Sequence, residues 1–190
     1  MTTKSPTPAN DLRPLRVDAR RNRERILVAA RDAFAEAGRD VQMPEIARAA
    51  GVGVGTLYRH FPAKDDLVRA LVRDKVQAGI ETAREALERD DPWEAVEWLV
   101  HESAAKMAVS RGLRDAMSVI DFGHENPWNS DEARRCAADL LDRAREVSAI
   151  RPDLTVDDWQ ALMCGLSAAI ASGADPARQA DFVLAAIRGR

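Results

Sequence analysis

The chain has 190 residues, of which 46% are hydrophobic, 31% charged and only 5% aromatic. This length suffices for one compact domain or two small ones, and the scarcity of aromatic residues favours helices over sheets. The sequence lacks the apolar run of roughly 18–20 residues that a membrane span needs, and its start lacks the apolar core of a secretion signal. Its two cysteines provide no disulfide framework. We therefore expect a mostly helical, cytoplasmic protein without a cofactor.

The net charge of −3 conceals an asymmetry between the two ends of the chain. Residues 1–75 contain 15 Lys and Arg against 10 Asp and Glu, a balance of +5, which leaves −8 for residues 76–190. A basic front and an acidic back are consistent with two tasks, one of them on a polyanion. Helical proteins also reach such local balances by chance, and charge alone does not decide between these explanations.

The expected elements are all helices, about nine of them, with no sheet. Residues 1–17 contain three prolines and few large apolar side chains, which is typical of a flexible arm. Glycines and prolines then separate segments with helical periodicity. In chain order, helices are expected near 18–37, 43–50, 54–61, 64–88, 92–110, 112–121, 131–149, 155–173 and 176–188.

The most informative stretch is residues 43–64, M-P-E-I-A-R-A-A-G-V-G-V-G-T-L-Y-R-H-F-P-A-K. Two short amphipathic segments joined by a turn with glycine are typical of a helix-turn-helix, in which small residues let the two helices cross closely. In the second segment, the spacing of Leu57 and Phe61 predicts an inward stripe. The side chains left outside combine hydrogen-bond donors with one methyl-rich group, a mixture that suits phosphates and base edges.

The string G-V-G-V-G-T-L-Y-R-H-F-P-A-K-D-D-L closely resembles the signature of the TetR family of bacterial transcriptional regulators. The preceding I-A-R-A-A and A-F-A-E-A-G fit the same family, and the close resemblance covers roughly residues 20–70. The resemblance implies a three-helix DNA-binding domain at 18–70, followed by a helical bundle at 71–190 that binds a small effector and forms a homodimer. The implied partners are therefore double-stranded operator DNA, a second copy and a small molecule, with no membrane and no metal.

The resemblance also implies roles for individual residues. Tyr58, His60 and Lys64 are expected on operator phosphates, and Val54 and Gly55 at the leading edge of the recognition helix. The full set expected to contact DNA is Val54, Gly55, Thr56, Tyr58, Arg59, His60 and Lys64.

The chain departs from the family pattern at the starts of both short helices. Gln42 and Gly53 stand where relatives often have a capping Ser or Thr, and Pro44 stands where a basic residue is sometimes available for a base. These departures speak against base reading from the helix expected at 43–50. They do not affect the expected fold.

Residues 76–190 contain all four tryptophans together with several Met and Phe residues. Such side chains usually form a core, but they also line concave apolar pockets with a few polar anchors. The stretch 121–129 is too broken for a helix and is expected to border a pocket mouth. The candidate effector-binding residues are Trp93, Trp98, Met107, Met117, Phe122, His124 and Trp128.

A stripe of large apolar residues follows the helix expected at 155–173 and continues in the last helix. Such a stripe packs within one chain or, as the resemblance implies, joins its symmetry mate in a four-helix bundle. A C2 dimer also suits recognition of a palindrome, because it presents two copies of one helix-turn-helix. The candidate interface residues are Trp159, Leu162, Met163, Leu166, Ile170 and Phe182.

Catalysis and nucleotide binding have little support in the sequence. Gly51, Gly53 and Gly55 mimic a dinucleotide-binding loop, but they follow a helix and not a strand. The histidines and cysteines do not lie at metal-ligand spacing. We predict a non-enzymatic DNA-binding regulator, a repressor released from its operator by a small effector. The alternatives are a helical small-molecule-binding protein without operator binding and a regulator that needs no ligand.

Overall fold

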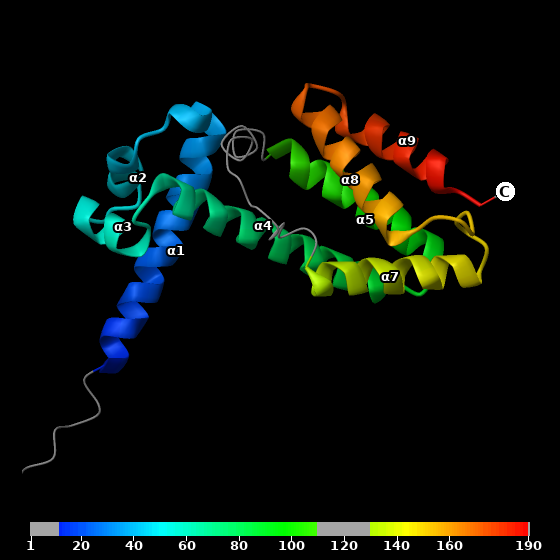
Figure 1. The fold of residues 1–190 in the computed structure, drawn as a ribbon, viewed down its shortest axis with the longest axis horizontal. Helices are drawn as coiled ribbons and strands as arrows, with labels where there is room; N and C mark the ends of the chain where they lie inside the picture. Colours follow the sequence, from blue (N-terminus) through cyan, green and yellow to red (C-terminus); the bar gives the residue numbers. More distant parts are fainter. Residues whose placement is uncertain (1–11, 110–129, 190) are drawn as a thin grey trace, which may run out of the picture.

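The computed structural model describes residues 12–109 and 130–189 (Figure 1). Within these ranges the chain contains eight α-helices and one short 3-10 helix, and the only β feature is a bridge between Ile150 and Arg188. The all-α expectation is thus confirmed, while the helix expected near 112–121 lies outside the described residues. None of the described helices is both long and apolar enough to cross a membrane.

Three helices form the N-terminal part: α1 (Leu12–Ala37), α2 (Met43–Ala49) and α3 (Val54–His60). Helix α1 begins earlier than residue 18, the expected start, because Pro14 falls in its first turn, where proline is tolerated. It ends where Gly38 has a φ of +56°, a conformation that favours glycine. The 3-10 helix η1 (Gly38–Asp40) then leads into α2.

A first hydrophobic core holds these three helices together with the start of α4 (Lys64–Leu87). Phe34 of α1, Ile46 of α2 and Leu57 of α3 are each fully buried. Phe61, directly after α3, is 3% exposed, so the inward stripe that its spacing with Leu57 predicts is present.

The C-terminal part consists of α5 (Pro92–Val109), α7 (Asp131–Glu146), α8 (Val156–Ala171) and α9 (Pro176–Ile187). The side chains of Ser130, Thr155 and Asp175 accept hydrogen bonds from backbone N–H groups in the first turns of α7, α8 and α9. Such caps satisfy donors that a helix leaves unpaired, which fixes where each helix begins. A second core fills the space between these helices.

Helix α4 runs through both parts of the molecule (Figure 1). Its residue Ile80 belongs to the first core, and Ala86, less than two turns later, belongs to the second. Arg143 of α7 fixes its end by donating hydrogen bonds to the carbonyls of Leu87 at 2.5 Å and Arg89 at 2.7 Å. The two parts are therefore connected by one helix that is anchored in each.

Candidate nucleic-acid interface and C-terminal surfaces

The turn between α2 and α3 depends on Gly51, which has a φ of +62°. Its carbonyl accepts a hydrogen bond of 3.0 Å from Nη2 of Arg25 on α1, and a Cβ at this position would collide with that guanidinium group. The N–H of Val52 donates to the carbonyl of Ala47 at 3.0 Å. These bonds set the angle between α2 and α3 and leave one face of α3 outside.

The outward face of α3 carries most of the residues that were expected to contact DNA. Val54 is 43% exposed and Tyr58, one turn later, is 44% exposed. Gly55 and Arg59 are exposed beside them. Thr56 and His60 are half-buried at its edges, and Leu57 faces the core. The face is neutral to basic, because it contains an arginine and no carboxylate.

Lys64 differs from the other expected contact residues because its ammonium group has a partner within the chain. Nζ donates a hydrogen bond of 2.7 Å to the carbonyl of Val41 and lies 5.7 Å from the ring centroid of Phe34. This bond ties the start of α4 to the segment between η1 and α2. An ammonium group can donate three hydrogen bonds, so the bond to Val41 is compatible with a phosphate contact. The expected phosphate contact stays a prediction.

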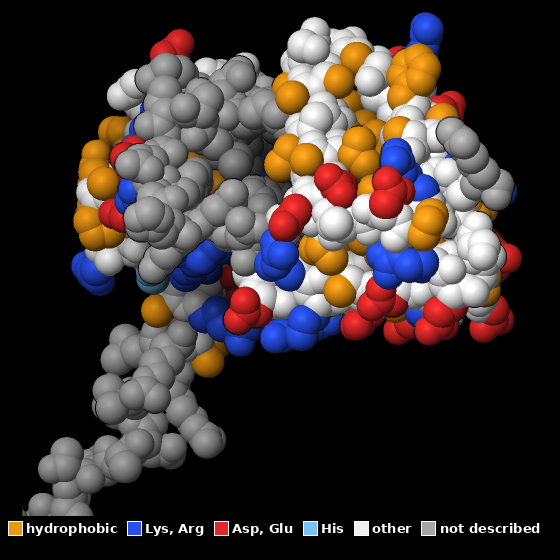
Figure 2. All heavy atoms as spheres, turned by 45° about the vertical axis from the view of Figure 1, so that its right-hand side comes forward, with side chains coloured by type: hydrophobic (Ala, Val, Ile, Leu, Met, Phe, Trp, Pro, Cys, Tyr) orange, Lys and Arg blue, Asp and Glu red, His pale blue; other side chains and the backbone are white. Residues whose placement is uncertain are grey.

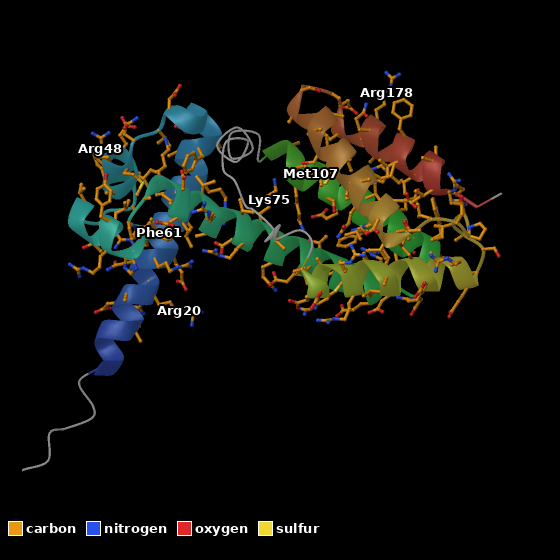
Figure 3. All side chains as sticks on the ribbon, viewed as in Figure 1. Arg20, Arg48, Phe61, Lys75, Met107 and Arg178 are labelled. Carbon is orange, nitrogen blue, oxygen red and sulfur yellow. The ribbon has the colours of Figure 1, made fainter. Side chains whose placement is uncertain are left out.

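Two arginines of α1 contact the residues on either side of α3, and the sequence did not reveal these contacts. Arg23 lies 5.6 Å from the ring centroid of Phe61, and Arg25 holds the carbonyl of Gly51. Both contacts join residues far apart in the chain, so the spacing of residues within one segment does not predict them. Figure 3 shows Arg48 projecting from α2, where it adds an exposed cation that the sequence analysis did not name.

Three of the candidate effector-binding residues lie within the described parts, all on α5. Trp93 stacks against the guanidinium group of Arg188, 3.8 Å from the ring centroid, and Trp98 against that of Arg89 at 4.3 Å. Both rings and Met107 are partly buried against the second core. These two tryptophans are thus covered by arginines of the chain itself. The other candidates, Met117, Phe122, His124 and Trp128, lie outside the described residues.

The apolar stripe on α8 faces the chain's own core. Trp159, Leu166 and Ile170 are 6%, 3% and 0% exposed, so most of their surface packs within one chain. Leu162 and Met163 are half-buried against the same core. The stripe faces inward because α8 packs against α5 and α9 of the same chain, and its largest side chains fill that contact.

The outward side of α8 carries small residues and borders a groove with α9. Ala161, Cys164, Gly165 and Ala168 are exposed at helical spacing, and Phe182 of α9 is 55% exposed. Figure 2 shows hydrophobic side chains on the C-terminal part of the molecule, on the right, above a lower edge where charged side chains are dense. The groove is lined by Arg151, Asp153, Leu154, Asp158, Ala161, Leu162, Gly165, Leu166, Gln179, Phe182, Val183 and Ala186.

Comparison with known proteins assigns the family. Residues 26–71 match the model of the bacterial regulatory proteins of the tetR family, and residues 91–189 match the SbtR-like transcriptional regulator C-terminal domain. The chain belongs to the TetR family. This TetR-family protein is a DNA-binding transcriptional regulator, and its α2 and α3 lie within the first matched range.

Relatives and solved structures support the same assignment along most of the chain. The HTH-type transcriptional repressor Rv1474c of Mycobacterium tuberculosis is 30% identical over 172 residues, which cover 83% of this chain and 87% of that protein. The structure of the TetR transcription regulatory protein from Mycobacterium vanbaalenii is 34% identical, with a TM-score of 0.68, and covers 92% of this chain and 99% of its own. For the TetR transcriptional regulator SCO0520 from Streptomyces coelicolor the identity is 28%, the TM-score 0.65 and the coverages 88% and 98%.

Proposed function

We propose that this TetR-family regulator is a cytoplasmic homodimeric repressor that binds a palindromic operator and is released by a small molecule. The observation that carries the proposal is the outward face of α3, which combines an exposed apolar residue, Val54, with the polar groups of Tyr58 and Arg59. Such a combination suits base edges and phosphates. The relative Rv1474c is named a repressor, which supports the same sign of regulation.

A second copy is required because one chain carries one α3, whereas a palindrome has two half-sites about 34–36 Å apart. The outer side of α8 and α9 suits this contact. Its small residues, among them Ala161, Gly165 and Ala168, allow helices to approach closely, and Phe182 supplies an exposed aromatic anchor. The proposed interface thus keeps Phe182 and Leu162 of the expected set, which both line the groove, whereas Trp159, Leu166 and Ile170 are almost fully buried within one chain.

Release by a small molecule is supported by the double anchoring of α4. The bond from Lys64 to Val41 fixes its start to the N-terminal part, and the bonds from Arg143 fix its end to α7. A ligand that shifts α5 or α7 therefore moves α4 and, with it, α3. A displacement of a few ångströms suffices to lose one half-site. The ligand must then bind the DNA-free dimer more tightly than the bound one, by the same factor by which it weakens operator binding.

The first test measures binding of the full chain to DNA from its own upstream region and to sites selected from random DNA. We expect two chains per site and an affinity that falls steeply with salt concentration. A protein that binds small molecules but selects no DNA sequence would support the alternative without operator binding. A protein that binds its operator and is released by no compound would support the ligand-independent alternative.

The second test uses the two cysteines as reporters of the dimer. Cys164 is exposed on the outer side of α8, whereas Cys136 of α7 is 9% exposed. In a Cys136→Ser variant, a maleimide probe should therefore label Cys164 rapidly in dilute protein and slowly at concentrations where the dimer forms. Equal labelling rates at all concentrations, with sedimentation showing dimers, would place the interface elsewhere.

A further inference from the structure

The outward face of α3 begins with a single side chain between two glycines. Val54 is 43% exposed, and Gly53 and Gly55 on either side have no side chain. A Cβ built at Gly55 meets nothing within 4 Å, so the space around this part of α3 is open. The isopropyl group of Val54 is therefore partly exposed at the start of α3, with no side chain at either neighbouring position.

The fold does not require this arrangement. Helix α3 is anchored in the core by Leu57, which is fully buried, and by Phe61 directly after it. Glycine within a helix is less favourable than alanine by about 0.8–1 kcal/mol, and a β-branched residue such as valine is also a weaker helix former than alanine. Val54 is not among the buried residues of the first core, and neither Val54 nor Gly55 is a strong helix former, which indicates a task outside the chain.

The chemistry of Val54 limits what it can recognise in the major groove. An isopropyl group has no hydrogen-bond donor or acceptor, so it cannot pair with the polar edge of guanine, adenine or cytosine. Thymine alone among the four bases presents a methyl group in this groove. The absence of side chains at Gly53 and Gly55 lets the backbone of α3 come close to the bases, which brings the short side chain of Val54 within reach.

We propose that Val54 reads thymine in each operator half-site by packing against its C5-methyl group. This inference rests on the operator binding proposed above and adds a base preference to it. The polar contacts of the same face then belong to Tyr58, which lies one turn further along, and to Arg59.

The test removes the methyl group from the DNA and the isopropyl group from the protein. The operator is first identified by selection from random DNA with the full chain. Each thymine of a half-site, with its symmetry mate, is then replaced by deoxyuridine, which lacks only the C5-methyl group and keeps Watson–Crick pairing. For the wild-type protein, we expect one symmetric position at which the replacement weakens binding about three- to tenfold.

The protein variants connect that position to Val54. Val54→Ala should bind the thymine operator several-fold more weakly than the wild type, and deoxyuridine at the same position should weaken its binding clearly less than it weakens wild-type binding. Val28→Ala is the matched control, because Val28 is also an exposed valine of the N-terminal part, 55% exposed on α1. This control should keep the full response to deoxyuridine.

The possible outcomes separate this inference from the function on which it rests. Operator binding that is insensitive to deoxyuridine at every position overturns the inference and leaves the repressor proposal intact. A Val54→Ala protein that distinguishes thymine from deoxyuridine as strongly as the wild type overturns it as well. Failure to select any DNA sequence overturns both. The wild-type measurement stands by itself if the variant folds poorly, which thermal unfolding followed by circular dichroism would reveal.

Discussion

Helices α3 and α8 each turn one side to the chain's own core and the other outward, and the two outward sides differ in chemistry. The outward side of α3 mixes one apolar residue with Tyr58 and Arg59. That of α8 presents small residues, Ala161, Cys164 and Ala168 among them, next to the exposed Phe182. The first side suits a polar, grooved partner, and the second suits another helix. In both helices the residues on the outward side indicate the kind of partner. The stripe of large apolar residues indicates the side that packs in the chain's own core.

The strongest test of this contrast compares the two sides of α8. Leu166→Ala should lower the free energy of unfolding by about 2–5 kcal/mol, because it leaves a cavity at a residue that is 3% exposed. Ala168→Ser, on the outward side, should change it by less than about 0.5 kcal/mol. Urea unfolding at a chain concentration low enough to keep the protein monomeric measures both. Equal losses for the two variants would contradict the assignment of an inner and an outer side.

The next prediction concerns the exposed anchor on α9. Phe182→Ala should weaken the dimer by about 2 kcal/mol, roughly thirtyfold, while the chain stays folded, because a central aromatic residue contributes much of the affinity of an interface. Sedimentation across a range of concentrations measures the dimer constant. Val147→Ala is the control, since Val147 is 57% exposed at the end of α7. If both variants dimerise like the wild type, Phe182 lies outside the interface.

Lys64 connects the reading surface to the fold, and its substitution separates the two roles. Lys64→Ala should lower the free energy of unfolding by about 1–1.5 kcal/mol through loss of the bond to Val41. It should also reduce the salt dependence of operator binding by about one ion per half-site, if a remaining proton contacts a phosphate. Thermal unfolding and binding titrations at several salt concentrations give the two values. A loss of stability with an unchanged salt dependence would assign Lys64 to the fold alone.

A smaller effect is expected at the start of α3, where Gly53 provides no side-chain cap. Its φ of −67° and ψ of 143° suit any residue, and a Cβ there would lie 3.8 Å from Oγ1 of Thr56, an ordinary contact. Gly53→Ser should therefore stabilise the protein by about 0.5–1 kcal/mol, by capping α3 and by restricting the unfolded chain. Thermal unfolding measures this gain. A less stable variant would mean that the turn does not tolerate a side chain at this position.

The smallest effect is a pH dependence at the start of α8. The hydroxyl and backbone N–H of Thr155 donate hydrogen bonds to Asp158 and hold the pKa of its carboxyl below its usual value. Because folding lowers this pKa, the ionised carboxyl of Asp158 stabilises the folded chain. This stabilisation is complete above the pKa of the unfolded chain and is lost as the pH falls through the pKa of the folded chain. Asp158→Asn should therefore flatten the decline of stability below about pH 4. Melting temperatures of both proteins between pH 3 and pH 6 provide the comparison.

Local patterns predicted the helices well because caps and breakers lie next to the segments they delimit. Gly38 ends α1 by its positive φ, and Thr155 begins α8 by accepting a hydrogen bond from the N–H of Asp158, three residues later. The same holds for the outward side of α3, since Leu57 and Phe61 define the inward side by spacing alone. The start of α1 was less predictable because a proline in a first turn reads the same as a proline in a loop.

Contacts between distant segments explain what the sequence could not predict. The stacking of Trp93 on Arg188 joins α5 to the end of α9, and the bond from Arg25 to Gly51 joins residues 26 positions apart. The direction of the α8 stripe depended on whether α5 and α9 of the same chain cover it, which hydrophobic periodicity does not encode. Packing within a chain and packing between chains use the same residue types, so only the assembled fold separates Leu166 from Phe182.

Cys136 lies on α7, yet it belongs to the first core, together with Val76 and Ile80 of α4. The N-terminal part therefore does not end where the DNA-binding motif ends. A fragment cut after residue 70 would lose buried apolar groups of its own core. A chimera that exchanges the C-terminal part must keep α4 and the beginning of α7 together with α2 and α3. The chain should accordingly unfold in one cooperative transition, with the DNA-reading and C-terminal parts losing their structure together.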